Sequence, residues 1–222
     1  ELGDLTVVGR NGDEIDVKYE GDNQYSFRMP VGGVTIRAEF TPRGQYGSFG
    51  DVARSDYFFD AVEWAAEQGI MDGVGGSSFA PADTLTRAMM AKILMNMADA
   101  SYTGSENPFS DVESGAWYTD AVIWAHKEGY ITGYDNGSFG TNDNITREQI
   151  AVMLYRFAGS PEVTGSLSGY ADSADVSEYA EKAMLWASQQ GIIGGRDGGK
   201  LAPSENASRS ECAAMIERFI SR

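Results

Sequence analysis

The chain has few residues of several kinds, and each shortage excludes a class of protein. Its 222 residues include a single cysteine, Cys212, so it has no internal disulfide framework. The single histidine, His126, lies beside Lys127 and Glu128 on the polar side of a predicted helix, which argues against a metal cluster or a serine–histidine relay. No run of about 18 apolar residues occurs, so no membrane-spanning helix is predicted.

Basic residues are also scarce, with 17 Lys and Arg against 33 Asp and Glu. Nucleic acids and anionic membranes bind basic faces, so neither is an expected partner. No pair of carboxylates stands out from the acidic background as a glycosidase pair, and we expect neither an enzyme nor a cofactor. At 42% hydrophobic residues, the chain is nevertheless able to bury a core.

A unit of about 60 residues is repeated three times. Arg87, Arg147 and Arg209 are separated by 60 and 62 positions. The same spacing relates three tryptophans and three glycines, which are Trp64, Trp124 and Trp186, and Gly69, Gly129 and Gly191. Repeats of this length are usually supersecondary units that bury their apolar faces against one another, so three units should form one body.

The first helix predicted in each unit has an apolar stripe and ends at one of these glycines. Its leading aromatic residue is Tyr57, Trp117 or Tyr179, for which we favour packing in the core over stacking on a sugar. A Gly-rich loop follows, in which Phe79, Phe139 and Leu201 should fill the core. Asp135 and Asp197 precede turn glycines, which favours turn formation over calcium binding.

The second helices carry the argument about function. Thr86, Thr146 and Ser208 are predicted N-caps, which places the three repeated arginines at the first helical position. A cation there costs about 0.3–1 kcal/mol. Two explanations stay open: an exposed guanidinium beside free N–H groups binds an anion, or each arginine forms an ion pair with a neighbouring unit, for example at Asp51 or Asp111.

Residues 1–42 have strand patterns at 5–9, 14–20, 24–29 and 34–40 and predict a small antiparallel β unit, followed by a linker at 43–48. The segments YSFRMP at 25–30 and GGVTIRAEF at 32–40 resemble the closing hairpin of the listeria-type B repeat of Gram-positive surface proteins. Any other short antiparallel sheet is the alternative.

Residues 109–158 contain a longer signature. In order, they hold FSD at 109–111, a helix with an aromatic start, GYITG at 129–133, DNGSF at 135–139 and ITREQ at 145–149. This arrangement resembles the surface-layer homology repeat. Residues 49–99 and 170–220 resemble it less closely, because the first lacks the Asp-Gly turn and the third has Leu201 in place of the phenylalanine.

The resemblance implies a mainly α, pseudo-threefold domain of three repeats, with the first helices bundled at its centre and grooves between neighbours. It implies non-covalent anchoring of a larger surface protein in the cell wall or S-layer of a Gram-positive bacterium. The partner would be a secondary cell-wall polysaccharide, often ending in pyruvylated N-acetylmannosamine. A structural spacer or protein-interaction module without glycan binding is the alternative.

The ligand-binding residues that the resemblance implies lie in the grooves and their loops. They are Arg87, Arg147, Arg209, Asp135, Asp197, Trp117, Gly133 and Gly195. We expect the chain to be a monomeric, extracellular fragment of a longer protein.

Overall fold

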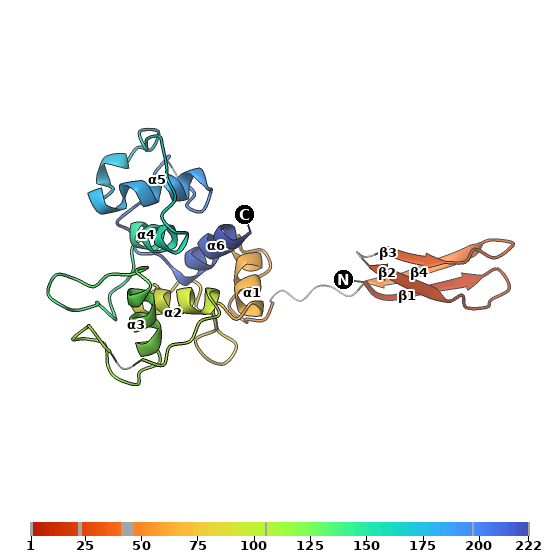
Figure 1. Ribbon diagram of the computed structural model, residues 1–222. Helices are drawn as coiled ribbons and strands as arrows, with labels where there is room; N and C mark the ends of the chain where they lie inside the picture. Colours follow the sequence, from red (N-terminus) through yellow and green to blue (C-terminus); the bar gives the residue numbers. More distant parts are fainter. Residues whose placement is uncertain (1, 22–23, 41–46, 105, 197, 222) are drawn as a thin grey trace. The chain divides into compact units, whose positions relative to one another are not determined.

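The structure is a computed structural model, and it divides into two compact units, residues 1–45 and 46–222 (Figure 1). The residues it describes are 2–21, 24–40, 47–104, 106–196 and 198–221. Most of the expected linker at 43–48 therefore lies outside the described residues. The two units are treated separately below.

The first unit contains the expected four strands: β1 (Leu2–Gly9), β2 (Val17–Gly21), β3 (Gln24–Phe27) and β4 (Val34–Phe40). β1 pairs antiparallel with β4, and β2 pairs antiparallel with β3. The expected hairpin between β3 and β4 is therefore wrong. The eight-residue β1 offers the seven-residue β4 a longer ladder than the four-residue β3 does.

The described residues of the second unit form six α-helices, two in each repeat. These are α1 (Phe59–Glu67), α2 (Arg87–Met97), α3 (Thr119–Lys127), α4 (Arg147–Phe157), α5 (Glu181–Gln189) and α6 (Arg209–Ile220). Two 3-10 turns, Ser173–Asp175 and Glu178–Ala180, precede α5.

The ends of these helices agree with the sequence prediction. Gly69, Gly129 and Gly191 follow the first helices with φ of 66°, 79° and 70°, a left-handed backbone that glycine adopts without steric cost. The capping boxes from Thr146 and Ser208 are both present. Thr86 caps α2 by accepting the Met89 N–H, without the reciprocal bond.

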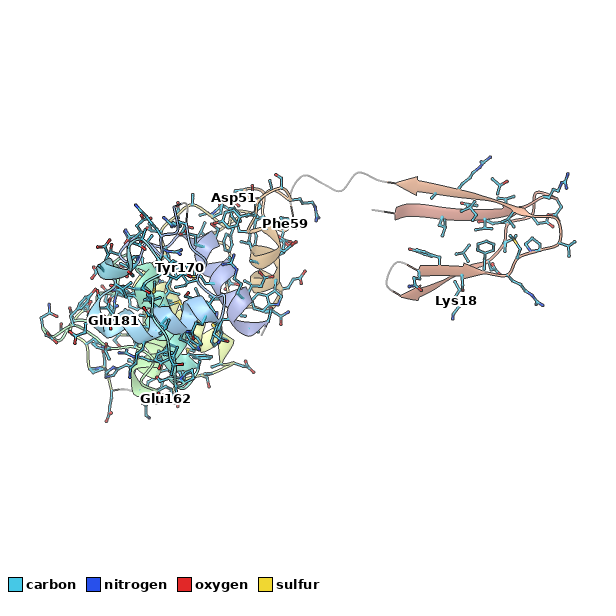
Figure 2. All side chains as sticks on the ribbon, turned by 90° about the horizontal axis from the view of Figure 1, so that it is seen from above. Lys18, Asp51, Phe59, Glu162, Tyr170 and Glu181 are labelled. Carbon is cyan, nitrogen blue, oxygen red and sulfur yellow. The ribbon has the colours of Figure 1, made fainter. Side chains whose placement is uncertain are left out.

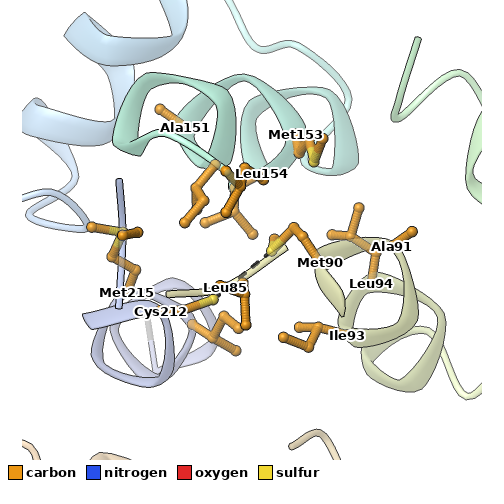
Figure 3. Close-up of a cluster of buried hydrophobic side chains, with 14 of the residues drawn as sticks. Leu85, Met90, Ala91, Ile93, Leu94, Ala151, Met153, Leu154, Cys212 and Met215 are labelled. Carbon is orange, nitrogen blue, oxygen red and sulfur yellow. Dashed lines mark hydrogen bonds between the residues drawn. The ribbon is translucent and has the colours of Figure 1, made fainter. Parts of the chain in front are cut away.

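Each first helix packs against the second helix of a different unit: α3 on α2, α5 on α4 and α1 on α6. The expectation that first helices form the centre was wrong. Side chains of α2, α4 and α6 face one another in the buried cluster of Figure 3, where Cys212 Sγ lies 3.9 Å from Met90 Sδ. The central position of α2 agrees with its burial, since α2 buries seven residues and α1 only four. Burial also raises the pKa of the Cys212 thiol to about 12, as expected of a core residue.

Backbone hydrogen bonds join the three units in a closed cycle just before the second helices. The Leu85 N–H donates to Ala207 O (3.0 Å), the Ala207 N–H to Ile145 O (3.0 Å), and the Ile145 N–H to Leu85 O (2.9 Å). All three side chains are fully buried, so water does not compete for these bonds.

The aspartate that opens each repeat holds the loop of its own unit in place. Asp111 accepts hydrogen bonds from the N–H groups of Phe139 (2.6 Å), Gly140 (2.8 Å) and Thr141 (3.1 Å). Asp51, beside the start of α1 in Figure 2, and Asp172 do the same for their loops. Phe79, Phe139 and Leu201 are thereby fully buried, as predicted.

These hydrogen bonds predict a pH-dependent stability. Burial alone would raise the pKa of Asp111, but the three N–H donors lower it below its ordinary value of 3.8. Because the pKa is lowered in the folded state, the ionised carboxylate stabilises the protein at neutral pH. That stabilisation disappears as pH falls through the folded-state pKa.

We expect Asp111→Asn to lower the free energy of unfolding by about 1–3 kcal/mol at pH 7, because the amide cannot accept from all of these donors. The difference from wild type should be smaller at pH 3, because below the ordinary value of 3.8 the Asp111 carboxylate takes up a proton more readily in the unfolded state than in the folded state. Urea unfolding at both pH values measures this. A difference of equal size at pH 7 and pH 3 contradicts the assignment.

Candidate ligand-binding site

The three repeated arginines are buried at the first position of α2, α4 and α6, with exposed fractions of 5%, 4% and 6%. Arg87 donates from Nε to Phe139 O (2.9 Å) and from Nη2 to Thr132 O (2.9 Å), both in the next unit. Arg147 donates in the same way to Leu201 O and Gly194 O, and Arg209 to Phe79 O and Asp72 O. Of the two explanations that the sequence left open, the one that needs exposed guanidiniums is therefore contradicted by this burial.

The N–H groups at these helix starts are occupied as well. The Arg87 N–H donates to Asp143 O (3.0 Å) and the Ala88 N–H to Thr141 O (3.3 Å), again in the next unit. α4 and α6 repeat both bonds. The partial negative charge of these carbonyls offsets the cost of a cation at the positive end of the helix.

Asp51 and Asp111, the expected ion-pair partners, were also the wrong residues, because they bind the loops of their own units. Arg147 does form an ion pair with the neighbouring unit, at Glu211, with Nη1 3.5 Å from Oε1. Each arginine therefore joins its own unit to the next through two of its three guanidinium nitrogens, Nε and Nη2.

A pocket of about 230 Å³ lies beside Arg87. Its walls come from all three units: Arg87, Ile131, Thr132, Gly133, Tyr134, Gln149, Val152, Met153, Arg156 and Tyr179. Within the described part of the chain, Arg87 Nη1 has no hydrogen-bond partner. Since every buried side-chain nitrogen and oxygen there has a partner, Nη1 must be accessible to solvent.

The lining of this pocket contains two guanidinium groups and no carboxylate. Arg156 is half-buried and has no ion pair among the described residues. Two carboxylates outside the lining accept hydrogen bonds from tyrosines that line the pocket: Asp143 from the Tyr134 hydroxyl (2.9 Å), and Glu148 from the Tyr179 hydroxyl (3.0 Å). The pocket is therefore suited to a small anion.

Tyr179 lines this pocket and donates its hydroxyl to Glu148. Burial, followed by the charge of Glu148, raises the pKa of its hydroxyl to about 12, so it stays protonated. Tyr179 as a whole residue is nonetheless 58% exposed. An exposed ring beside an anion site can stack on the apolar face of a sugar.

A second pocket of about 220 Å³ lies beside Arg147 and uses equivalent positions. Its lining is Tyr57, Arg147, Gly194, Gly195, Arg196, Glu211, Ala214, Met215 and Arg218. This lining contains a carboxylate, Glu211, which is bonded to Arg196 and paired with Arg147. Arg196 is bonded to Glu205 as well.

The structure brings some of the predicted site residues together and separates others. Gly133 lines the Arg87 pocket and Gly195 the Arg147 pocket. Trp117 and Arg209 line neither, and Asp135 is exposed in a turn outside both. Asp197 lies outside the described residues.

The leading aromatics do not pack in the core, contrary to the favoured interpretation. Tyr57, Trp117 and Tyr179 are 75%, 60% and 58% exposed, and the first and last line the pockets. His126 was expected on the polar side of its helix, but it is half-buried. Its ring centroid lies 4.8 Å from that of Phe109.

Sequence reasoning missed Arg156 in the Arg87 pocket, and Arg196 and Arg218 in the Arg147 pocket. Arg156 and Arg218 are 62 positions apart, as Arg147 and Arg209 are, so the repeat period contained a signal for these two. The corresponding position in the first unit is Asn96, so the arginine recurs in only two of the three units.

Among the described residues, no helix is long and apolar enough to cross a bilayer. Nor do the His, Cys, Asp and Glu side chains of the described segments gather in a group that could hold a metal ion.

Comparison with known proteins gives one consistent family. A family model described as S-layer homology domain matches residues 48–91, 108–151 and 169–213, together more than half of the chain.

Three relatives have this region within longer proteins. An amylopullulanase of Thermoanaerobacterium thermosulfurigenes is 30% identical over 87% of this chain, which covers 11% of that protein. The surface-layer 125 kDa protein of Lysinibacillus sphaericus is 31% identical over 75% of this chain and 14% of its own length. A cellulosome-anchoring protein of Acetivibrio thermocellus is 26% identical over 68% of this chain and 35% of its own length. The chain thus spans about a third or less of these relatives.

Proposed function

The chain belongs to the S-layer homology family, and we propose that it anchors a larger protein non-covalently to the wall of a Gram-positive cell. S-layer homology domains are non-catalytic anchoring modules of S-layer and cellulosome-anchoring proteins. Some relatives are enzymes, whose catalytic domains lie outside this region. We propose that the activity of the parent protein is likewise located elsewhere.

We propose that the three units, 49–99, 109–158 and 170–220, form a pseudo-threefold ring with ligand grooves between neighbours. The cyclic backbone contacts of Leu85, Ile145 and Ala207 support this arrangement. We also propose that the preceding β unit is the end of a listeria-type B repeat module, on its four short antiparallel strands and with β4 paired to β1 in place of β3.

The proposed ligand is a secondary cell-wall polysaccharide that ends in pyruvylated N-acetylmannosamine. The observation that carries this proposal is the Arg87 pocket, which holds two guanidiniums without a carboxylate in its lining. The pyruvate carboxylate would bind Arg87 Nη1 and Arg156, and the sugar would lie against Tyr179 and Gly133. Trp117, Asp135 and Asp197 stay proposed contacts to outer sugars.

Arg156 is the residue with which to test this pocket, because Arg87 also holds the fold together. We expect Arg156→Gln to weaken binding of a pyruvylated N-acetylmannosamine disaccharide by about tenfold or more, since a charge-assisted hydrogen bond is lost. Calorimetric titration measures the affinity, and circular dichroism checks the fold.

Arg218→Gln is the matched control, because Arg218 has the same helical position in the Arg147 pocket. It should leave the affinity unchanged. Equal losses in both variants would mean that the sugar does not select the Arg87 pocket.

A spacer without glycan binding is the second candidate. It is favoured by the inter-unit hydrogen bonds of the three arginines, which give these residues a structural role without a ligand. If the folded wild type binds neither the pyruvylated nor the plain disaccharide, this candidate replaces the anchor.

A further inference from the structure

The two pockets differ at one chemically decisive position, the third residue of the second helix. It is Gln149 in α4, beside Arg87, and Glu211 in α6, beside Arg147. Both side chains have the same local task. Gln149 Oε1 accepts the Thr146 N–H at 3.3 Å, and Glu211 Oε2 accepts the Ser208 N–H at 3.0 Å. One is neutral and the other is an anion.

Glu211 occupies the position that the Arg87 pocket leaves free. Its Oε1 lies 3.5 Å from Arg147 Nη1 and is also bonded to Arg196 Nη2. The equivalent nitrogen, Arg87 Nη1, has no partner among the described residues. The Glu211 carboxylate thus stands where a ligand carboxylate would stand in the other pocket.

Glu211 keeps its negative charge at neutral pH. Burial alone would raise its pKa, but the Ser208 N–H and the guanidiniums of Arg196 and Arg147 lower it below the ordinary value. Its side chain is only 18% exposed, so water screens the charge weakly.

The number of arginines alone would favour the Arg147 pocket as the anion site. The Arg147 pocket has three arginines, Arg147, Arg196 and Arg218, and the Arg87 pocket has two. Arg147 and Arg196, however, are paired with Glu211, and Arg196 with Glu205 as well. A second carboxylate entering there would meet like charge at close range.

We propose that residues 149 and 211 decide which groove accepts an anionic sugar: Glu211 closes the Arg147 groove as an internal anion, and Gln149 leaves the Arg87 groove open. This inference rests on the proposed function, since it specifies where the wall polymer binds. The grooves of the three-repeat module would then differ in their affinity for the anionic sugar.

The test exchanges the two residues while keeping the N-cap. Glu211→Gln gives α6 the residue of α4, and Gln149→Glu gives α4 the residue of α6, so each variant retains an oxygen for the capping bond. The probe is the methyl glycoside of pyruvylated N-acetylmannosamine, with the unpyruvylated glycoside as control. Amide chemical shifts of Gly133 and Tyr134 report on one groove, and those of Gly194 and Gly195 on the other.

In the wild type, the pyruvylated probe should shift the Gly133 and Tyr134 amides only. Glu211→Gln should add saturable shifts at Gly194 and Gly195. Gln149→Glu should weaken binding at Gly133 and Tyr134 by about tenfold or more. The unpyruvylated glycoside should not distinguish the variants.

Other outcomes overturn the inference and separate it from the proposed function. If the Arg87 groove binds the probe but Glu211→Gln opens nothing, the groove-selection inference is wrong and the anchor stands. Wild-type binding at Gly194 and Gly195 equal to that at Gly133 has the same meaning. Absence of binding in all variants removes both proposals.

Discussion

Replacing Arg209 with alanine is expected to lower the free energy of unfolding of the helical unit by about 3–5 kcal/mol. Arg209 is buried and donates from Nε to Phe79 O (2.8 Å) and from Nη2 to Asp72 O (2.6 Å). Its guanidinium also lies over the Phe79 ring, 4.6 Å from the centroid. Alanine leaves these carbonyls without donors and opens a cavity between the last unit and the first.

Urea unfolding followed by tryptophan fluorescence measures this loss, because all four tryptophans lie in residues 46–222. Arg218→Ala in the same helix is the control: its side chain is exposed, and we expect a change within about 0.5 kcal/mol. If the two variants lose equal stability, the inter-unit hydrogen bonds of Arg209 do not stabilise the helical unit.

Gly133→Ala is expected to have the second largest effect, destabilising the fold by about 1–3 kcal/mol and abolishing binding in the Arg87 pocket. A Cβ at Gly133 would lie 2.4 Å from Phe109 Cε1 and 2.7 Å from Ser138 O. The carbonyl belongs to the backbone and the ring packs against the buried Phe139, so neither can move freely.

Gly195→Ala is the matched control in the Arg147 pocket. There a Cβ would lie 3.5 Å from Lys200 O and 3.6 Å from Tyr170 Cε1, which are ordinary contacts. We expect a change in stability within about 0.5 kcal/mol. Thermal unfolding and titration with the pyruvylated disaccharide measure both variants. Equal effects at the two glycines would contradict the contact argument.

The sequence alone determined the repeat and its local structure. The 60- and 62-residue periods located the three units, and Thr146 and Ser208 were correctly predicted as N-caps. Gly129 was predicted to end its helix, and Phe139 to fill the core, and both are confirmed. These features depend on residues within a few positions of one another or on a periodicity that the chain itself displays.

Only the tertiary structure decided what the arginines contact and which pocket has a carboxylate in its lining. Whether Arg87 meets a carbonyl or solvent depends on residues 132 and 139, in another unit. The same holds for the packing of α3 on α2 and for the pairing of β1 with β4. The effect of Glu211 depends on Arg147 and Arg196 being beside it. Such contacts join chain segments tens of residues apart, and their energies depend on burial that no local pattern determines.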